Sequence, residues 1–347
     1  MCGIVGAAAQ RDVIPLLING LQRLEYRGYD SAGVAVQSDQ ALLERVRKVG
    51  KVSELMRALQ ENPVSGQTGI AHTRWATHGE PSEQNAHPHV CHERVAVVHN
   101  GIIENHDALR AQQQQGGYRF TSQTDTEVIV HQIDHYLEQG KDLLEAVRLT
   151  VADLEGAFAL GVINKEEPGR MIAARRGSPL VVGIADDEML IASDIAALVA
   201  ETQQFVFLQD GDVADIRHSG MTVYDEHGVE VERPVQTSTV TADATDKGDY
   251  AHYMLKEIFE QPRAIADTLE GRIGANRVFE EAFGVGAGEI FDEVAGVHII
   301  ACGTSYHAGM VGRHWLESIA GIPCSVEVAS EFRYRHPVVR KKSLIVT

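Results

Sequence analysis

Short apolar segments with the composition of β-strands fill the first 230 residues of this chain and constrain its fold more than any other feature. They come in consecutive blocks and do not alternate strictly with helical patterns, so they predict a layered α+β architecture. We expect strands at residues 3–9, 31–37, 69–72, 94–99, 156–163, 171–175, 180–184 and 205–208. Amphipathic helices are expected at residues 13–24, 52–60, 105–114, 124–138 and 143–154.

Residues 233–249 read RPVQTSTVTADATDKGD, a polar, threonine-rich stretch that has no apolar period. Such composition is typical of a linker, so we predict a first domain over residues 2–232 and a second over residues 250–347. The second domain is expected to alternate helices and strands, in the order 250–272, 297–301, 306–320, 326–329, 330–334 and 343–347. The chain stops inside the last apolar run, from which we expect the second domain to be incomplete.

Charge and composition exclude several classes of function. The 347 residues carry a net charge of −18, which argues against sequence-independent binding of nucleic acid. No apolar run approaches the roughly 18 residues that a membrane span needs. The four cysteines show no CxxC pair, which indicates neither a disulfide scaffold nor a zinc ribbon and favours a reducing cytoplasm. They are Cys2, Cys91, Cys302 and Cys324.

Cys2 becomes a thiol with its own free amine once Met1 is removed. The amine has a reference pKa of about 7.7–8.0 and the thiol of about 8.5, so the amine can accept the thiol proton near neutral pH. The strand expected directly behind it would hold the thiol in one place. The alternative is a small, buried cysteine in a fraying terminus.

Two loops offer groups that bind anions or oxyanions. Arg74, in the sequence AHTRWATHG after a strand, can hold a carboxylate in a bidentate fork, or can be a solvated arginine beside a packed Trp75. Asn100 and Gly101 can form an oxyanion hole from a side-chain amide and a backbone N–H. The same Asn-Gly pair is also typical of a hairpin turn.

Two further segments each allow a structural and a functional reading. Thr124 and Glu127 fit a helix capping box, in which Asp125 either adds a favourable charge or binds a substrate ammonium. The sequence CGTS at residues 302–305 lies between a strand and a helix, where its N–H groups can bind a phosphate or cap the helix.

Several histidines lie close together in the sequence and could be metal ligands, but their spacing fits neither the HExxH motif nor a zinc finger. We therefore predict no metal site. The members are His72, His78, His87, His89, His92, His99 and His106, with Cys91 among them.

Seven motifs in order resemble the class II glutamine amidotransferases, most closely those members that aminate fructose 6-phosphate. Together they span essentially the whole chain. They are residues 2–6 (CGIVG), 27–33 (RGYDSAG), 72–79 (HTRWATHG), 99–105 (HNGIIEN), 124–127 (TDTE), 302–305 (CGTS) and 329–335 (ASEFRYR).

The resemblance implies an N-terminal nucleophile hydrolase, an αββα sandwich, followed by part of a sugar isomerase (SIS) domain. It implies that the Cys2 thiolate attacks the side-chain amide of glutamine, with Asn100 and Gly101 holding the oxyanion. The resemblance also implies that Arg74 binds the α-carboxylate of glutamine, that Asp125 binds its ammonium, and that Thr77 and His78 make further glutamine contacts. It implies that Trp75 gates the passage of ammonia and that His87 lies at the hinge or active site. In the second domain it implies sugar-phosphate contacts for Gly303, Thr304 and Ser305.

The implied function is glutamine-dependent formation of glucosamine 6-phosphate from fructose 6-phosphate, without a cofactor, in a cytoplasmic protein that is a homodimer at full length. This chain would supply glutamine hydrolysis, because the family's second phosphate loop and Schiff-base lysine lie beyond residue 347. The alternatives are another class II amidotransferase, such as an amidophosphoribosyltransferase, and a non-catalytic sugar-phosphate sensor.

Overall fold

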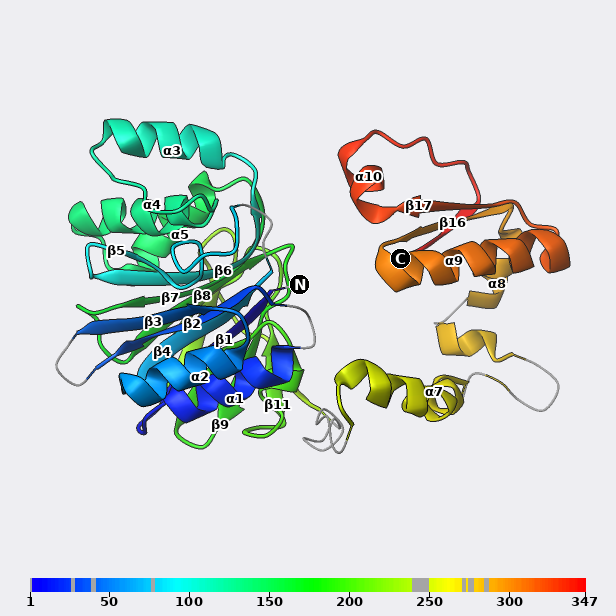
Figure 1. Cartoon of the computed structure of the whole chain (residues 1–347). Coiled ribbons are helices and arrows are strands. Elements are labelled where there is room, and N and C mark those ends of the chain that lie inside the picture. Colours follow the sequence, from blue (N-terminus) through cyan, green and yellow to red (C-terminus); the bar gives the residue numbers. More distant parts are fainter. Residues whose placement is uncertain are drawn as a thin grey trace. The chain divides into compact units, whose positions relative to one another are not determined.

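A computed structural model describes residues 2–25, 29–38, 42–75, 79–238, 250–269, 273, 278–283 and 287–347 of the chain. These residues form two compact units, Met1–Tyr253 and Met254–Thr347, which we call the first and second units. Figure 1 shows the chain with its elements labelled. Within the described ranges, no helix combines the length and the apolar composition that crossing a lipid bilayer requires.

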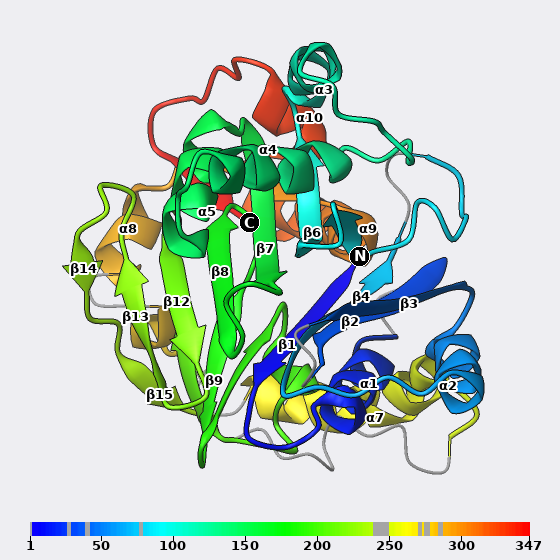
Figure 2. The ribbon, with the colours of Figure 1, turned by 90° about the vertical axis from the view of Figure 1, so that its left-hand side faces the viewer.

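Two large sheets face one another in the first unit (Figure 2). In spatial order, the eight strands of one sheet are β15 (Val235–Thr237), β11 (Gln204–Phe207), β9 (Val181–Ala185), β10 (Glu188–Ala192), β1 (Gly3–Ala8), β4 (Thr68–Arg74), β2 (Ser31–Gln37) and β3 (Leu43–Val49). The seven strands of the other sheet are β14 (Glu230–Val231), β13 (Gly220–Tyr224), β12 (Val213–Arg217), β8 (Arg170–Arg176), β7 (Gly156–Asn164), β6 (Val95–Ile103) and β5 (His89–Cys91).

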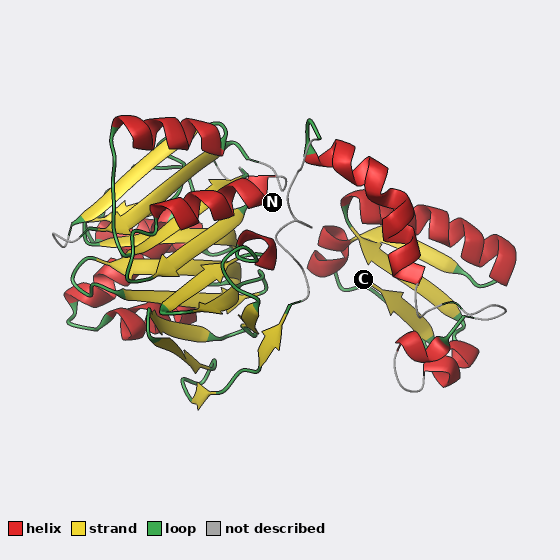
Figure 3. Ribbon diagram, turned by 90° about the horizontal axis from the view of Figure 1, so that it is seen from below, coloured by secondary structure: helices red, strands yellow, loops and turns green. Residues whose placement is uncertain are grey.

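Helices cover the outer face of each sheet and complete four layers (Figures 1 and 3). The eight-stranded sheet carries α1 (Ile14–Leu24), α2 (Val52–Glu61) and the short 3₁₀ helix η2 (Ile195–Ala197). The seven-stranded sheet carries α4 (Glu127–Glu138) and α5 (Leu143–Asp153), and α3 (His106–Gln115) packs on α4. This arrangement confirms the expected αββα sandwich.

Three apolar clusters hold the four layers together, one between each pair of layers. The inner cluster lies between the two sheets and contains Ile4 and Ile70 from one sheet and Val98 and Ile163 from the other, all fully buried. Removing such a side chain from water contributes about 1.5–3 kcal/mol. The inner cluster therefore fixes how the two sheets, and the groups at their strand ends, face each other.

Strand β1 is an internal strand, paired antiparallel with β10 on one side and β4 on the other. Its six residues, GIVGAA, are all buried, as a strand enclosed by neighbours on both edges and layers on both faces requires. Gly3 pairs with Thr73 and Ile4 with His72. Cys2, the residue before β1, is thereby held at the end of β4.

Several strands were not expected from the sequence. The most informative is β3, LERVRKV, in which pairs of charged residues separate single apolar residues. Among the described residues, it pairs within its sheet only with β2. Strand β10 was missed as well, although it pairs with β1. Strand β15 lies inside the expected linker and pairs with β11, while residues 239–249 lie outside the described part of the chain. The domain boundaries at 232 and 250 stay predictions.

The second unit has a parallel three-stranded sheet in the order β17 (Cys324–Val328), β16 (Gly296–Ala301) and β18 (Ser343–Val346). Helix α9 (Gly303–Trp315) packs on β16 and β17, begins three residues before the expected helix and continues as a π-helical turn over Leu316–Ala320. The other helical elements are α7 (Tyr253–Leu269), η3 (Glu280–Phe283), α8 (Ala287–Glu293) and α10 (Ala329–Tyr334).

Truncating Ile70 tests the role of the inner cluster. Ile70→Ala removes a fully buried side chain from between the sheets, and we expect it to lower the free energy of unfolding of the first unit by about 2–5 kcal/mol. Urea unfolding followed by circular dichroism measures the loss, and hydrogen exchange in β1 and β4 assigns it to this unit. The matched control is Val229→Ala, a 58% exposed position, which should change stability by no more than about 0.5 kcal/mol.

Candidate active site

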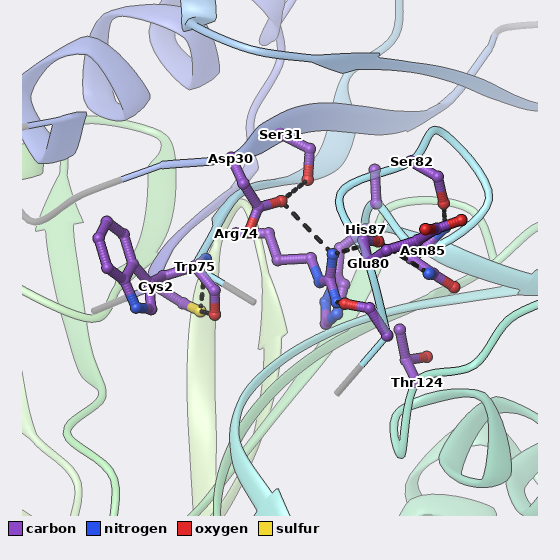
Figure 4. A network of polar contacts seen from close by, with 12 residues as sticks. Cys2, Asp30, Ser31, Arg74, Trp75, Glu80, Ser82, Asn85, His87 and Thr124 are labelled. Carbon is purple, nitrogen blue, oxygen red and sulfur yellow. Dashed lines mark hydrogen bonds and ion pairs between the residues drawn. The ribbon is translucent and has the colours of Figure 1, made fainter. Parts of the chain in front are cut away.

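Cys2 lies against the backbone of Trp75 at the joint ends of β1 and β4 (Figure 4). Its Sγ accepts a hydrogen bond from the Trp75 N–H at 3.1 Å and donates to the Trp75 carbonyl at 3.4 Å. Burial raises the pKa of the thiol above its ordinary value. Ionisation of this thiol therefore needs a base close by. The Trp75 side chain itself is 54% exposed.

Asn100 and Gly101 lie within β6, in register with Ala159 and Phe158 of β7, so the hairpin-turn alternative is wrong. The Asn100 Nδ2 donates to the Cys2 carbonyl at 3.2 Å, which places the amide beside the residue that carries the thiol. Gly101 has φ +130°, and a Cβ there would lie 2.0 Å from the Ala157 carbonyl oxygen. Only glycine fits this position.

Arg74 is 3% exposed, and its guanidinium extends away from Cys2 (Figure 4). Nη2 donates to the Gly79 carbonyl at 2.9 Å, and Nη1 lies 3.4 Å from both Asp30 Oδ1 and the Glu80 carbonyl. The alternative of a solvated arginine is therefore wrong. Nearby, Asn85 Nδ2 donates to the Glu80 carbonyl at 2.9 Å and ties the loop to this cation.

Asp125 and Glu127 order the segment before α4, but not as a capping box. The Glu127 carboxylate reaches back to the backbone N–H groups of Thr121 and Ser122, at 2.8 and 2.7 Å, and α4 begins at Glu127 itself. Burial opposes ionisation of Glu127, yet hydrogen bonds from His131, Ser122 and Thr121 outweigh it and hold its pKa below the ordinary value. The capping-box expectation is wrong because Glu127 holds residues upstream of the helix.

The segment held by Glu127 brings Asp125 to the end of β6. Asp125 is 4% exposed, and its Oδ2 accepts a hydrogen bond from the Ile103 N–H at 2.9 Å. The carboxylate is thereby joined to the strand that carries Asn100 and Gly101. Asp125 thus comes to the same strand as the predicted oxyanion donors.

Four histidines are buried together behind the oxyanion donors. The rings of His72 and His87 stack at 4.1 Å between centroids, and His87 lies 4.9 Å from His89 and 6.4 Å from His99. Thr126 Oγ1 contacts both His87 Nε2 and His99 Nδ1, at 3.3 and 2.9 Å. This cluster, His72, His87, His89 and His99, joins β4, β5 and β6 to the segment that carries Asp125.

Sequence reasoning assigned no site role to His72, Thr126 or Asp30. One signal was present for His72: in a strand, residues two apart point to the same face, so His72 shares a face with Arg74. Nothing in the sequence placed Thr126 between two histidines, because those contacts join segments 27 and 39 residues apart.

Among the described residues, one group has the donor atoms and spacing of a metal site: Cys91, His92 and Asp134, with donors within 4.8 Å of one another. The Asp134 oxygens already accept hydrogen bonds from Arg94, His92 and Tyr118. A cation there would compete with the Arg94 guanidinium, so this group supports no metal assignment. The absence of a metal site stays a prediction.

The predicted sugar-phosphate residues Gly303, Thr304 and Ser305 form the first turn of α9, after the N-cap residue Cys302. They are exposed, and their N–H groups lie at the positive end of the helix dipole. Thr77 and His78, predicted to contact glutamine, lie outside the described residues, as do Arg27 and Gly28 of the second motif.

Comparison with known families finds two matches. A glutamine amidotransferase domain matches residues 72–200, and an SIS domain matches residues 293–347. The chain is 56% identical over all 347 residues to the glutamine–fructose-6-phosphate aminotransferase (isomerizing) of Shewanella oneidensis, and 55% identical to that of Pseudomonas aeruginosa. In both comparisons the match covers 100% of this chain but only 57% of the relative.

Solved structures include the same fold. A glutamine phosphoribosylpyrophosphate amidotransferase from Bacillus subtilis, solved with ADP and GMP, superposes with a TM-score of 0.60 at 21% identity. The superposition covers 94% of this chain and 65% of the other. At this identity the likeness supports the fold and says nothing of the substrate.

The buried histidines predict a steep loss of stability in mild acid. Burial lowers the pKa of His72 to about 3, and those of His87 and His89 well below the ordinary value. The unfolded chain takes up these protons near pH 6.5 and the folded chain does not. The stabilisation is thus complete above pH 6.5 and falls by about 1.4 kcal/mol per pH unit per histidine below it. Urea unfolding between pH 7 and 5 measures this slope.

Two glutamine substitutions separate the buried histidines from the rest of the chain. His72→Gln should reduce the slope by about 1.4 kcal/mol per pH unit, because one titrating group is removed. His227→Gln is the matched control, since the His227 side chain is 77% exposed, and it should leave the slope unchanged. An unchanged slope in His72→Gln would contradict the assignment of a depressed pKa to His72.

Proposed function

We propose, from the premise that this chain belongs to the class II glutamine amidotransferases and continues into an SIS domain, that Cys2 hydrolyses the side-chain amide of glutamine to glutamate and ammonia. The observation that carries the proposal is the meeting of strand ends in the first unit. Cys2 precedes β1, Asn100 donates to its carbonyl, and Asp125 is bonded to the same strand as Asn100.

The reaction begins with transfer of the Cys2 thiol proton to the free α-amine of the same residue, which requires removal of Met1. The thiolate attacks the amide carbon, and the negative charge that develops on the amide oxygen is stabilised by Asn100 Nδ2 and the Gly101 N–H. The α-ammonium then protonates the leaving nitrogen, and the tetrahedral intermediate releases ammonia and becomes a thioester. Water hydrolyses the thioester, which releases glutamate and restores the thiol.

The two charged groups of glutamine share its α-carbon, and each binds a residue of opposite charge. The α-carboxylate binds Arg74, whose guanidinium now contacts the carbonyls of Gly79 and Glu80, together with Thr77 and His78. The α-ammonium binds the Asp125 carboxylate. One of its two oxygens, Oδ2, already accepts a hydrogen bond from the Ile103 N–H. Both side chains are nearly buried, and Arg74 already has the Asp30 carboxylate as a partner of opposite charge at 3.4 Å.

For the whole protein we propose glutamine-dependent conversion of fructose 6-phosphate to glucosamine 6-phosphate, in the cytoplasm and as a homodimer, without a cofactor. The support is the activity for which the relatives are named, and this chain spans 57% of their length. Gly303, Thr304 and Ser305 would contact the sugar phosphate at the start of α9, Trp75 would gate ammonia, and His87 would act at the hinge or active site.

Cys2→Ala provides the direct test. We expect wild-type chain with a confirmed N-terminal Cys2 to release glutamate from glutamine, and Cys2→Ala to release none above background, because the nucleophile is gone. Cys324→Ala, a buried cysteine in the second unit, is the matched control and should retain wild-type turnover. Absence of glutamate from the wild-type sample would favour a non-catalytic sugar-phosphate sensor instead.

Asp125→Asn tests the ammonium site. The amide keeps an acceptor for the Ile103 N–H but loses the negative charge, so we expect the KM for glutamine to rise by about 10- to 100-fold, the equivalent of one hydrogen bond to a charged group. Steady-state glutamate release measures it. Asp107→Asn, whose side chain is 92% exposed, should leave KM unchanged. An unaltered KM in Asp125→Asn would remove Asp125 from the glutamine site.

A further inference from the structure

We propose that His72 is the positioning residue of the oxyanion hole: its ring N–H fixes which way the Asn100 amide points, and so directs the Asn100 NH₂ towards the amide oxygen of the substrate. The inference deepens the proposed glutaminase function and rests on it. It comes from the contacts of one ring nitrogen with a backbone carbonyl and a side-chain amide.

The tautomer of His72 follows from its partners. His72 Nε2 lies 3.0 Å from the His99 carbonyl oxygen and 2.9 Å from Asn100 Oδ1. A backbone carbonyl can only accept, so Nε2 must carry the proton. Nδ1 is buried and has no hydrogen-bond partner among the described residues, as expected for the unprotonated nitrogen of a neutral ring.

The orientation of Asn100 follows in turn. An amide turned the other way would set its NH₂ against the His72 N–H, donor against donor, in a buried site. With Oδ1 facing His72, Nδ2 points to the Cys2 carbonyl at 3.2 Å. Amide oxygen and nitrogen look alike by shape, so this polarity is set by hydrogen bonds alone.

The ring of His72 is itself held in place. It stacks on His87 with 4.1 Å between centroids and an angle of 13° between planes. His87 Nδ1 accepts from the His99 N–H at 3.2 Å, which leaves its Nε2 to donate to Thr126 Oγ1. The ring is thus held by its hydrogen bonds to β6 and by the stacked ring of His87, which also contacts β6. Burial keeps it neutral at physiological pH, so the contact persists throughout the working range.

Without the His72 N–H, the Asn100 amide gains a competing orientation. The His99 carbonyl would lose this donor, and an Asn100 amide turned the other way would no longer set its NH₂ against the His72 N–H. Each molecule that turns its amide in this way withdraws one oxyanion donor. Because removal of one such donor typically lowers kcat by about 10²–10³-fold, a partial turn should cost a fraction of that factor.

Two substitutions at His72 separate orientation from packing. His72→Phe keeps an aromatic ring against His87 but has no donor, and we expect kcat for glutamate release to fall by about 10- to 100-fold while KM changes less than about twofold. His72→Gln restores an N–H at the reach of Nε2, and kcat should return to within about fivefold of wild type. Equal losses in both variants, or a loss confined to KM, would overturn the proposal.

A double substitution tests whether His72 acts through Asn100. In an Asn100→Ala background there is no amide to orient, so adding His72→Phe should lower kcat by less than about threefold further. If the two losses multiply, His72 acts independently of Asn100 and the assignment is wrong. Circular dichroism and urea unfolding of each variant show that the compared proteins are folded.

The tautomer is measurable in the unsubstituted chain, even if His72→Phe fails to fold. In ¹⁵N-histidine NMR, the His72 signal, assigned by its loss in His72→Gln, should show a proton on Nε2 and none on Nδ1 between pH 6 and 8. A proton on Nδ1 alone would overturn the proposal. If the wild-type chain releases no glutamate, the proposed function fails instead, and this spectrum still decides the geometry.

Discussion

The pairing of β1 with β4 and β10 is the constraint on which the rest of the first unit depends. All six residues of this internal strand are buried, and Cys2 directly precedes Gly3, the first residue that pairs with β4. Apolar packing between the sheets then sets the distance from β4 to β6. A thiol so close to a chain terminus, where residues are usually poorly ordered, is thereby placed against the backbone of Trp75.

The buried polar groups behind this thiol make hydrogen bonds with one another and with the backbone of β6. A neutral histidine has one N–H donor and one acceptor nitrogen. A backbone carbonyl that fixes which nitrogen carries the proton can therefore also fix the orientation of a side-chain amide bonded to the same ring. Charged residues in their place would need partners of opposite sign. Arg74 and Asp125 are the charged residues that we propose to bind the charged groups of glutamine.

Apolar periodicity predicted the layers, and motif resemblance predicted Cys2, Asn100 and Asp125. Strand β3 was missed because its charged residues break the apolar run, and only pairing with β2 reveals it. The role predicted for Glu127 was wrong because a carboxylate can accept hydrogen bonds from residues upstream of a helix as readily as it caps the helix. The polarity of Asn100 was out of reach, because it depends on a carbonyl contacted by a histidine 27 residues away.

The internal position of β1 also dictates when the site can exist during synthesis. One neighbour of β1 is made by residue 74, but the other, β10, ends only at Ala192. Until the ribosome has released that segment, one edge of the first strand is open. Such long-range closure slows folding. The first strand of this unit therefore becomes an internal strand only after most of the unit has been synthesised.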